Sequence, residues 1–176
     1  QDGSPIAALK RNVYQAAFAG TQGWIAAFER PKITNPENPD RILLIDPSTD
    51  QIRASLTSAH RLNALAASAD RKLLAIAGDD QRVTILDADP LTELHRFRAH
   101  DAAITALKFH PSNPILATGS ADFSIRLWDY STATLRQTFL GLDGRPVTMS
   151  FSPNGKMLAV DGMERAFRIY EVEADD

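Results

Sequence analysis

Short apolar runs separated by turn-forming residues make up most of the chain. In the segment 124–129, Ile125, Leu127 and Asp129 alternate with Ser124, Arg126 and Trp128, which is the two-residue period of a β-strand. The run from Leu107 to Phe109 stops at a His-Pro pair, and other runs stop at clusters of Gly, Asn, Asp and Ser. These features predict strands joined by tight turns and therefore an all-β protein.

A nine-residue motif occurs three times, and each copy begins 42 residues after the one before. Its copies are DDQRVTILD at 79–87, ADFSIRLWD at 121–129 and MERAFRIYE at 163–171. Self-similarity at about 40 to 45 residues is typical of four-stranded propeller blades. A looser copy opens the chain, with strands expected at 13–18, 23–28 and 41–46. It carries a proline-rich insertion at 29–40.

The copy HDAAITALKFHPSNPILATGSADFSIRLWD at 100–129 resembles the WD-repeat (WD40) β-propeller family. The resemblance implies a structural tetrad of hydrogen-bonded side chains at His100, Thr118, Asp122 and Trp128. The second copy departs from it with Ile76 and Leu86, and His60 lies two residues from the position that His100 predicts. The last copy has Val160, Glu164 and Tyr170 at tetrad positions. One complete tetrad is therefore expected.

The resemblance implies one all-β propeller segment with about four four-stranded antiparallel blades, the last without its outermost strand. The expected blades are 11–56, 57–98, 99–140 and 141–176, with 1–10 as an outer strand of a preceding or closing blade. Rings of this family have seven or eight blades, so we expect part of a longer propeller. Two chains that pair as half-rings, and a closed four-blade ring, are the alternatives.

Composition limits the chemistry. Nineteen basic and 22 acidic residues give a net charge of -3, so no general attraction to nucleic acid or to an anionic membrane is expected. Without cysteine, the chain has neither disulfides nor thiolate metal ligands. No apolar run approaches the length of a membrane span. A cytoplasmic location is favoured, although no signal identifies the compartment.

Catalytic residues, cofactors and metal ligands are not predicted. The four histidines lack the spacing of a metal site. His95 and His110 are expected at strand ends or turns. Asp80, Asp122 and Glu164 are expected to stabilise turns, and the acids that end the third strands are expected to be structural in the same way. These acids are Asp46, Asp87, Asp129 and Glu171.

Function is expected on the loops that lead into each innermost strand and on the turns between the two middle strands. The 42-residue shift makes Arg61, Ala103 and Arg145 equivalent. Asp79, Ala121 and Met163 form a second equivalent set, just before the turn acids. Because guanidinium groups bind carboxylates and phosphates through paired hydrogen bonds, the arginines favour an acidic or phosphorylated peptide or protein partner. The alternative interpretation, that these charges are solvated loop residues, stays open.

The role of the insertion and the function of the chain each leave two hypotheses open. The insertion 29–40 is either a second contact surface, since the repeat does not require it, or a surface loop that the fold merely tolerates. The favoured function is a non-catalytic scaffold for protein–protein interaction. The alternative is a propeller that forms a substrate-binding or regulatory part of a larger enzyme.

Overall fold

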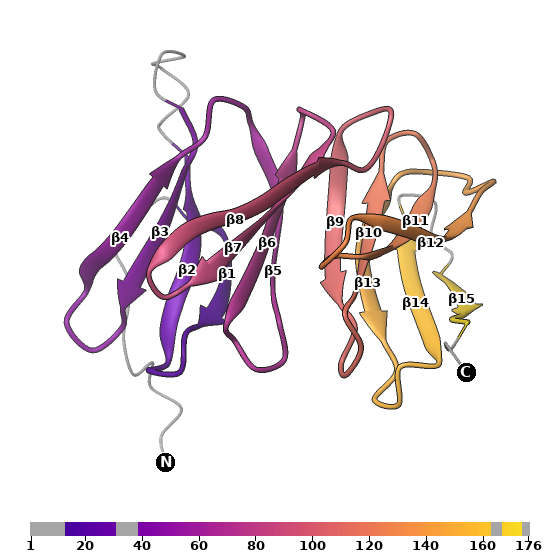
Figure 1. The fold of residues 1–176 in the computed structure, drawn as a ribbon. Coiled ribbons are helices and arrows are strands. Elements are labelled where there is room, and N and C mark those ends of the chain that lie inside the picture. The colour runs from indigo at the N-terminus through magenta and orange to yellow at the C-terminus, as the bar shows by residue number, and fades with distance from the viewer. Residues whose placement is uncertain (1–12, 31–38, 163–166, 174–176) are drawn as a thin grey trace, which may run out of the picture.

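The computed structural model describes residues 13–30, 39–162 and 167–173, and within these ranges all regular structure is β-strand (Figure 1). Four antiparallel sheets follow one another along the chain. Sheet 1 consists of β1 (Val13–Ala19), β2 (Trp24–Glu29), β3 (Arg41–Asp46) and β4 (Gln51–Thr57). Sheet 2 consists of β5 (Leu62–Ala67), β6 (Leu73–Gly78), β7 (Arg82–Ala88) and β8 (Leu91–Arg98). Sheet 3 consists of β9 (Ile104–Phe109), β10 (Ile115–Ser120), β11 (Ile125–Asp129) and β12 (Thr134–Phe139). Sheet 4 consists of β13 (Pro146–Phe151), β14 (Met157–Gly162) and β15 (Phe167–Glu171).

The sheets stand side by side, with their first strands gathered on one side. β5 contacts both β1 and β9, and β9 contacts β13. Within each sheet the strands pair in chain order, so β4, β8 and β12 lie outermost. This arrangement confirms the prediction of all-β, blade-like sheets, and the four sheets do not close into a ring (Figure 1).

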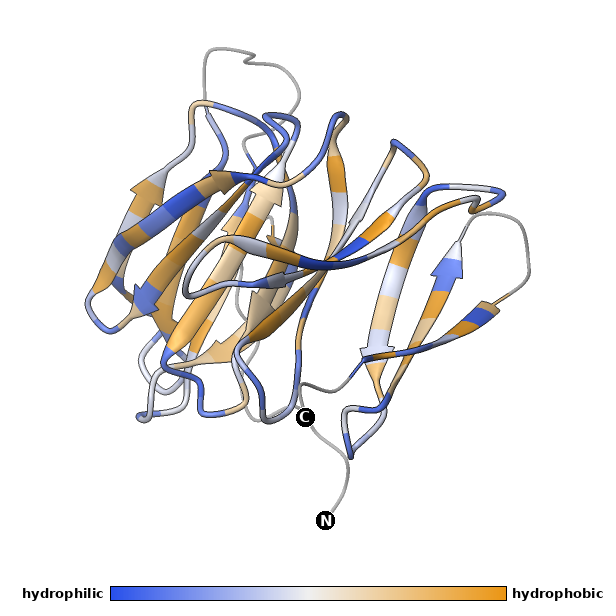
Figure 2. Cartoon of the chain, turned by 45° about the vertical axis from the view of Figure 1, so that its right-hand side comes forward, coloured by the Kyte–Doolittle hydropathy of each residue, from blue (hydrophilic) through white to orange (hydrophobic). Residues whose placement is uncertain are grey.

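Apolar packing between neighbouring sheets forms the core. Because strand side chains alternate between two faces, each inner sheet presents one apolar face to the sheet before it and one to the sheet after it. Ile76 and Leu86 of sheet 2 pack on sheet 1, whereas Val83 and Ile85 pack on sheet 3. Figure 2 shows hydrophobic residues along the strands and hydrophilic residues at the turns.

The acids that end the third strands organise the turns that follow. The carboxylate of Asp46 accepts a hydrogen bond from the backbone N–H of Ser48 at 2.9 Å, and Asp129 accepts one from Ser131 at 3.0 Å. Asp87 binds the N–H of Asp89 in the same way at 2.8 Å. Carboxylates that satisfy backbone donors two residues ahead stabilise such turns locally. The structural role predicted for these three acids is therefore confirmed.

The two histidines predicted at strand ends or turns differ in their positions. His110 lies in the turn after β9 as predicted, but His95 lies inside β8, where a strand end or turn was expected. There its ring contacts Phe97 at 5.5 Å, and Nε2 donates to the carbonyl of Tyr130 at 2.7 Å. A polar ring fits mid-strand because it bonds to the next sheet.

Some of the sequence predictions lie outside the described residues. These are residues 1–10, residues 31–38 of the insertion, and Met163 and Glu164, each from one set of repeat-equivalent positions.

Candidate functional site

A chain of hydrogen bonds joins four side chains within sheet 3. The indole N–H of Trp128 donates to the hydroxyl of Thr118 at 3.2 Å, and Thr118 donates to Nε2 of His100 at 2.7 Å. Nδ1 of His100 donates to Oδ2 of Asp122 at 2.9 Å. His100 is fully buried and precedes β9, whereas its partners lie on β10, β11 and the turn between them. The structure thus brings together the four residues of the proposed tetrad.

The charge state of this network follows from burial. Burial lowers the pKa of His100 below 6.5, although the hydrogen bond to Asp122 acts in the opposite direction. Burial also opposes ionisation of Asp122, but hydrogen bonds from Ser124 and His100 outweigh it and lower the pKa to about 2. A neutral imidazole therefore faces an ionised carboxylate, in agreement with Nε2 acting as an acceptor.

The equivalent positions in sheet 2 hold no such network. Ile76 and Leu86 replace the hydroxyl and the indole, and both are buried apolar residues. Ser58 occupies the position equivalent to His100, and its hydroxyl donates to the carbonyl of His60 at 2.7 Å. His60 itself is exposed in the loop before β5. Sheet 2 therefore relies on apolar packing at this position.

The loop side of the sheets carries a depression of about 430 Å³ between sheets 2, 3 and 4. Five of the six residues predicted from the sequence as partner-binding line it: Arg61, Asp79, Ala103, Ala121 and Arg145. The sixth, Met163, lies outside the described residues. We call this hollow the loop-side depression. The equivalent loops of three successive repeats therefore converge on one surface.

Backbone hydrogen bonds fix the rim of the loop-side depression. The N–H of Asp79 donates to the carbonyl of Arg61 at 3.0 Å, and the N–H of Ala121 donates to that of Ala103 at 2.9 Å. Gly78 permits this close approach, because a Cβ there would lie 1.8 Å from the carbonyl oxygen of Arg61. Each incoming loop is thus tied to the turn between the middle strands of its own sheet.

Four lining residues were missed in the sequence. Asn63, Thr105 and Val147 are again related by the 42-residue shift, two residues after Arg61, Ala103 and Arg145, and Pro146 is the fourth. The repeat itself could have revealed three of them. The amide of Asn63 donates to the carboxylate of Asp79 at 2.7 Å. The hydroxyl of Thr105 lies 2.5 Å from the carbonyl oxygen of Pro146 and links sheets 3 and 4.

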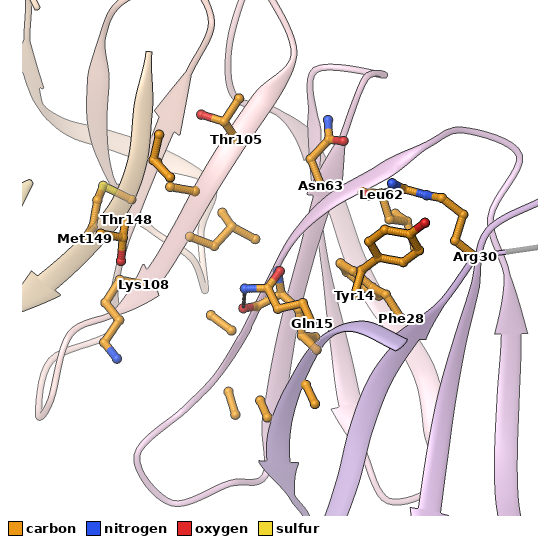
Figure 3. Close-up of a pocket in the computed structure, with 18 residues that line it drawn as sticks. Tyr14, Gln15, Phe28, Arg30, Leu62, Asn63, Thr105, Lys108, Thr148 and Met149 are labelled. Carbon is orange, nitrogen blue, oxygen red and sulfur yellow. Dashed lines mark hydrogen bonds between the residues drawn. The ribbon is translucent and has the colours of Figure 1, made fainter. Parts of the chain in front are cut away.

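A larger groove of about 720 Å³ follows the innermost strands and shares Asn63, Thr105 and Val147 with the loop-side depression. In Figure 3, Tyr14, Gln15 and Arg30 lie on one side of this groove and Thr105, Lys108 and Thr148 on the other. The side-chain amide of Gln15 donates to the carbonyl of Leu65 at 3.1 Å and accepts from its N–H at 3.0 Å. This amide therefore satisfies the free edge of β5 at that residue and links sheets 1 and 2.

Among the described residues, no group of three or more His, Cys, Asp or Glu side chains could hold a metal ion. Within the same ranges no helix is long and apolar enough to cross a membrane. The loop-side depression is lined by two arginines, one aspartate and uncharged residues.

Four like sheets with convergent loops define a repeat protein of the β-propeller type. The family model "WD domain, G-beta repeat" matches residues 91–129. The chain is 33% identical over 95 residues to human WD repeat-containing protein 36, covering 54% of this chain and 10% of that protein. It is 31% identical over 110 residues to mouse coronin-7, covering 58% and 12%. Polycomb protein esc of Drosophila virilis is 27% identical over 129 residues, covering 71% and 29%.

The chain therefore contains a WD40 repeat at residues 91–129 and is similar to WD40 repeat proteins over more than half of its length. It spans between about a tenth and three tenths of the length of these curated relatives. WD40 proteins are generally non-catalytic scaffolds whose repeats mediate protein–protein interaction.

Proposed function

We propose that this chain is a non-catalytic interaction scaffold that binds an acidic or phosphorylated peptide in the loop-side depression. The observation that carries the proposal is the convergence of Arg61 and Arg145 on one hollow, although they stand 84 residues apart in the sequence. Both arginines are exposed, and each lies immediately before an innermost strand, β5 or β13. A carboxylate or phosphate in the hollow would be within the reach of guanidinium groups from two sheets.

The charge of the lining supports this choice of partner. Two arginines face one carboxylate, that of Asp79, and the amide of Asn63 already donates to this carboxylate. The lining therefore has an excess of positive charge although the whole chain is acidic. Small residues, Ala103 and Ala121, leave room for the backbone of a bound peptide. Local positive potential on an acidic protein gives selectivity for an anionic group without general attraction to polyanions.

Charge reversal tests the proposal. Binding of fluorescent peptides with a phosphoserine or a glutamate cluster is measured by anisotropy, with sequence-matched neutral peptides for comparison. We expect Arg61→Glu and the double variant Arg61→Glu/Arg145→Glu to weaken acidic-peptide binding at least tenfold. The matched control is Lys72→Glu/Lys156→Glu, which makes the same charge change at exposed turns on the opposite end of the strands.

Thermal unfolding of each variant shows that the fold is retained. An equal loss of acidic-peptide affinity in the double variant and in its control would show that the effect comes from net charge. It would reject the loop-side depression as the site. Binding that is the same for acidic and neutral peptides would reject the predicted partner chemistry.

A further inference from the structure

A second hollow, of about 120 Å³, lies between sheets 1 and 2. Aliphatic side chains line its interior: Ile42 and Leu56 from sheet 1, and Leu62, Ile76 and Leu86 from sheet 2. The loop residues Ser58, Ala59 and His60 border it. We call this hollow the aliphatic pocket.

The repeat explains why the aliphatic pocket exists. Ser58 is equivalent to His100, whose buried imidazole fills the corresponding space in sheet 3 against Thr118 and Trp128. In sheet 2 the short side chain of Ser58 bonds within its own loop and does not enter that space as a ring would. The pocket is therefore the place that an aromatic ring occupies one repeat further along the chain.

The walls determine which ring would fit. Ile76 and Leu86 replace the hydroxyl and the indole N–H of sheet 3, so these two positions offer no partner for a ring nitrogen. The polar groups of the lining are the hydroxyls of Thr57, Ser58 and Thr84, the loop residue His60 and the charged residues described below. An uncompensated polar atom in an apolar space is costly, which favours a phenyl ring over an imidazole. Aliphatic cavities of about 150 Å³ in proteins take up benzene, so the size suits one ring.

Charged residues stand around the aliphatic pocket. The carboxylate of Asp80 is paired with the guanidinium of Arg96, and Arg82 and Glu93 also line the pocket. Because both signs are present in equal number, this rim does not select an ion. It instead surrounds an apolar interior with hydrated groups, the arrangement in which aromatic anchors contribute most to protein interfaces.

The aliphatic pocket and the loop-side depression share two short segments. His60 borders the pocket and Arg61 lines the depression, while Asp80 lines the pocket and Asp79 the depression. A single extended peptide that crosses these segments would contact both. Consecutive residues therefore border the two hollows at both segments.

We propose that the aliphatic pocket binds the phenyl ring of an aromatic residue in the same peptide whose acidic group occupies the loop-side depression. This inference rests on the proposed function for the identity of the partner, but the pocket is tested without any charged ligand. The probe is N-acetyl-phenylalanine amide, and N-acetyl-alanine amide is the control that lacks the ring.

Methyl NMR spectra of the chain detect ring binding through ring-current shifts. We expect saturable shifts at Ile76 and Leu86 with the phenyl probe, and none with the alanine control. Methyl groups buried between sheets 3 and 4, such as those of Leu127, serve as an internal reference. Ser58→Phe supplies a ring from within the chain and should abolish the shifts.

Ile76→Thr provides a second variant, in which a shorter and polar side chain in the wall should weaken probe binding at least fivefold. The proposal is overturned if Ile76 and Leu86 do not shift at the solubility limit of the probe. It is overturned equally if folded Ser58→Phe binds the probe as the natural chain does. Ring binding without acidic-peptide binding would refute the loop-side depression alone, and the reverse result would refute the aliphatic pocket alone.

Discussion

His100 and Asp122 stand 22 residues apart, yet Nδ1 of the histidine and a carboxylate oxygen of the aspartate lie 2.9 Å from each other. The same carboxylate accepts from the N–H of Asp101 at 3.2 Å and from the hydroxyl of Ser124 at 2.6 Å. One carboxylate thus links the loop before β9 to the turn after β10. This link positions the loop that contains Ala103, which lines the loop-side depression.

Asp122→Ala should lower the free energy of unfolding by about 2 to 3 kcal/mol, because it leaves the buried Nδ1–H of His100 and other donors without an acceptor. Urea denaturation measures the change. Lys156→Ala, an exposed substitution, should stay within about 0.5 kcal/mol of the natural chain. Equal tolerance of both substitutions would contradict the structural role of the carboxylate.

Thr118→Val tests the middle of the network with little change in shape. The hydroxyl is both acceptor for Trp128 and donor to His100, so its loss leaves two buried polar atoms unmet. We expect a cost of about 1 to 3 kcal/mol in chemical denaturation. Thr148→Val, at an exposed position of β13, is the matched control and should be nearly neutral. A cost no larger than that of the control would show that the network contributes nothing to stability.

Acid should destabilise the chain in two stages. Burial lowers the pKa values of His100 and His110 in the folded state, so the unfolded chain takes up more protons and stability falls as the pH drops below 6.5. Hydrogen bonds hold the pKa values of Asp122 and Asp129 at about 2, so their contribution, present above pH 3.8, is lost as the pH falls toward 2. Melting temperatures between pH 7.5 and 2.5 measure both stages. A melting temperature that stays constant from pH 7.5 to 5 would contradict the neutral, buried state of the two histidines.

The substitution Gly155→Ala tests the contact between the turns of sheets 3 and 4, where Gly155 meets His110. The imidazole Nε2 donates to the carbonyl of Gly155 at 3.2 Å, and a Cβ on this glycine would lie 2.0 Å from Nε2. Gly155→Ala should therefore cost more than the roughly 1 to 2 kcal/mol expected for its positive φ alone. Gly23→Ala is the matched control, since Gly23 has a similar φ and no atom within 4 Å of the added carbon. Equal costs in thermal denaturation would refute the close packing of His110.

Much of the fold was predictable because the repeat places strands, turns and their acids at a constant spacing. Five of the residues that line the loop-side depression followed from the same spacing, whereas Asn63, Thr105, Pro146 and Val147 were missed. Contacts between sheets could not be predicted in this way. The bond from Gln15 to Leu65 joins residues 50 positions apart, and the bond from His95 to Tyr130 joins two different sheets. Such pairs depend on how the sheets pack, which leaves no periodic signal in the sequence.

The aliphatic pocket could not be predicted from the sequence for the same reason. Ile76 and Leu86 were recognised in the sequence as departures from the tetrad, but their consequence, a hollow of about 120 Å³ beside the loop 58–61, depends on the packing of sheet 1 on sheet 2. The space that a missing ring would occupy can be filled by neighbouring side chains or can remain as a hollow. Here the packing of sheet 1, which contributes Ile42 and Leu56 to the lining, leaves space.

The most direct test of the central claim maps peptide contacts by amide NMR during titration with a phosphoserine peptide. Its unphosphorylated form provides the comparison. The account predicts that shifts dependent on the phosphate concentrate at Arg61, Asp79, Ala103 and Ala121, which lie around one depression at the loops of sheets 2 and 3. Phosphate-dependent shifts confined to the turns at the opposite end of the strands, or to the outermost strands β4, β8 and β12, would contradict it.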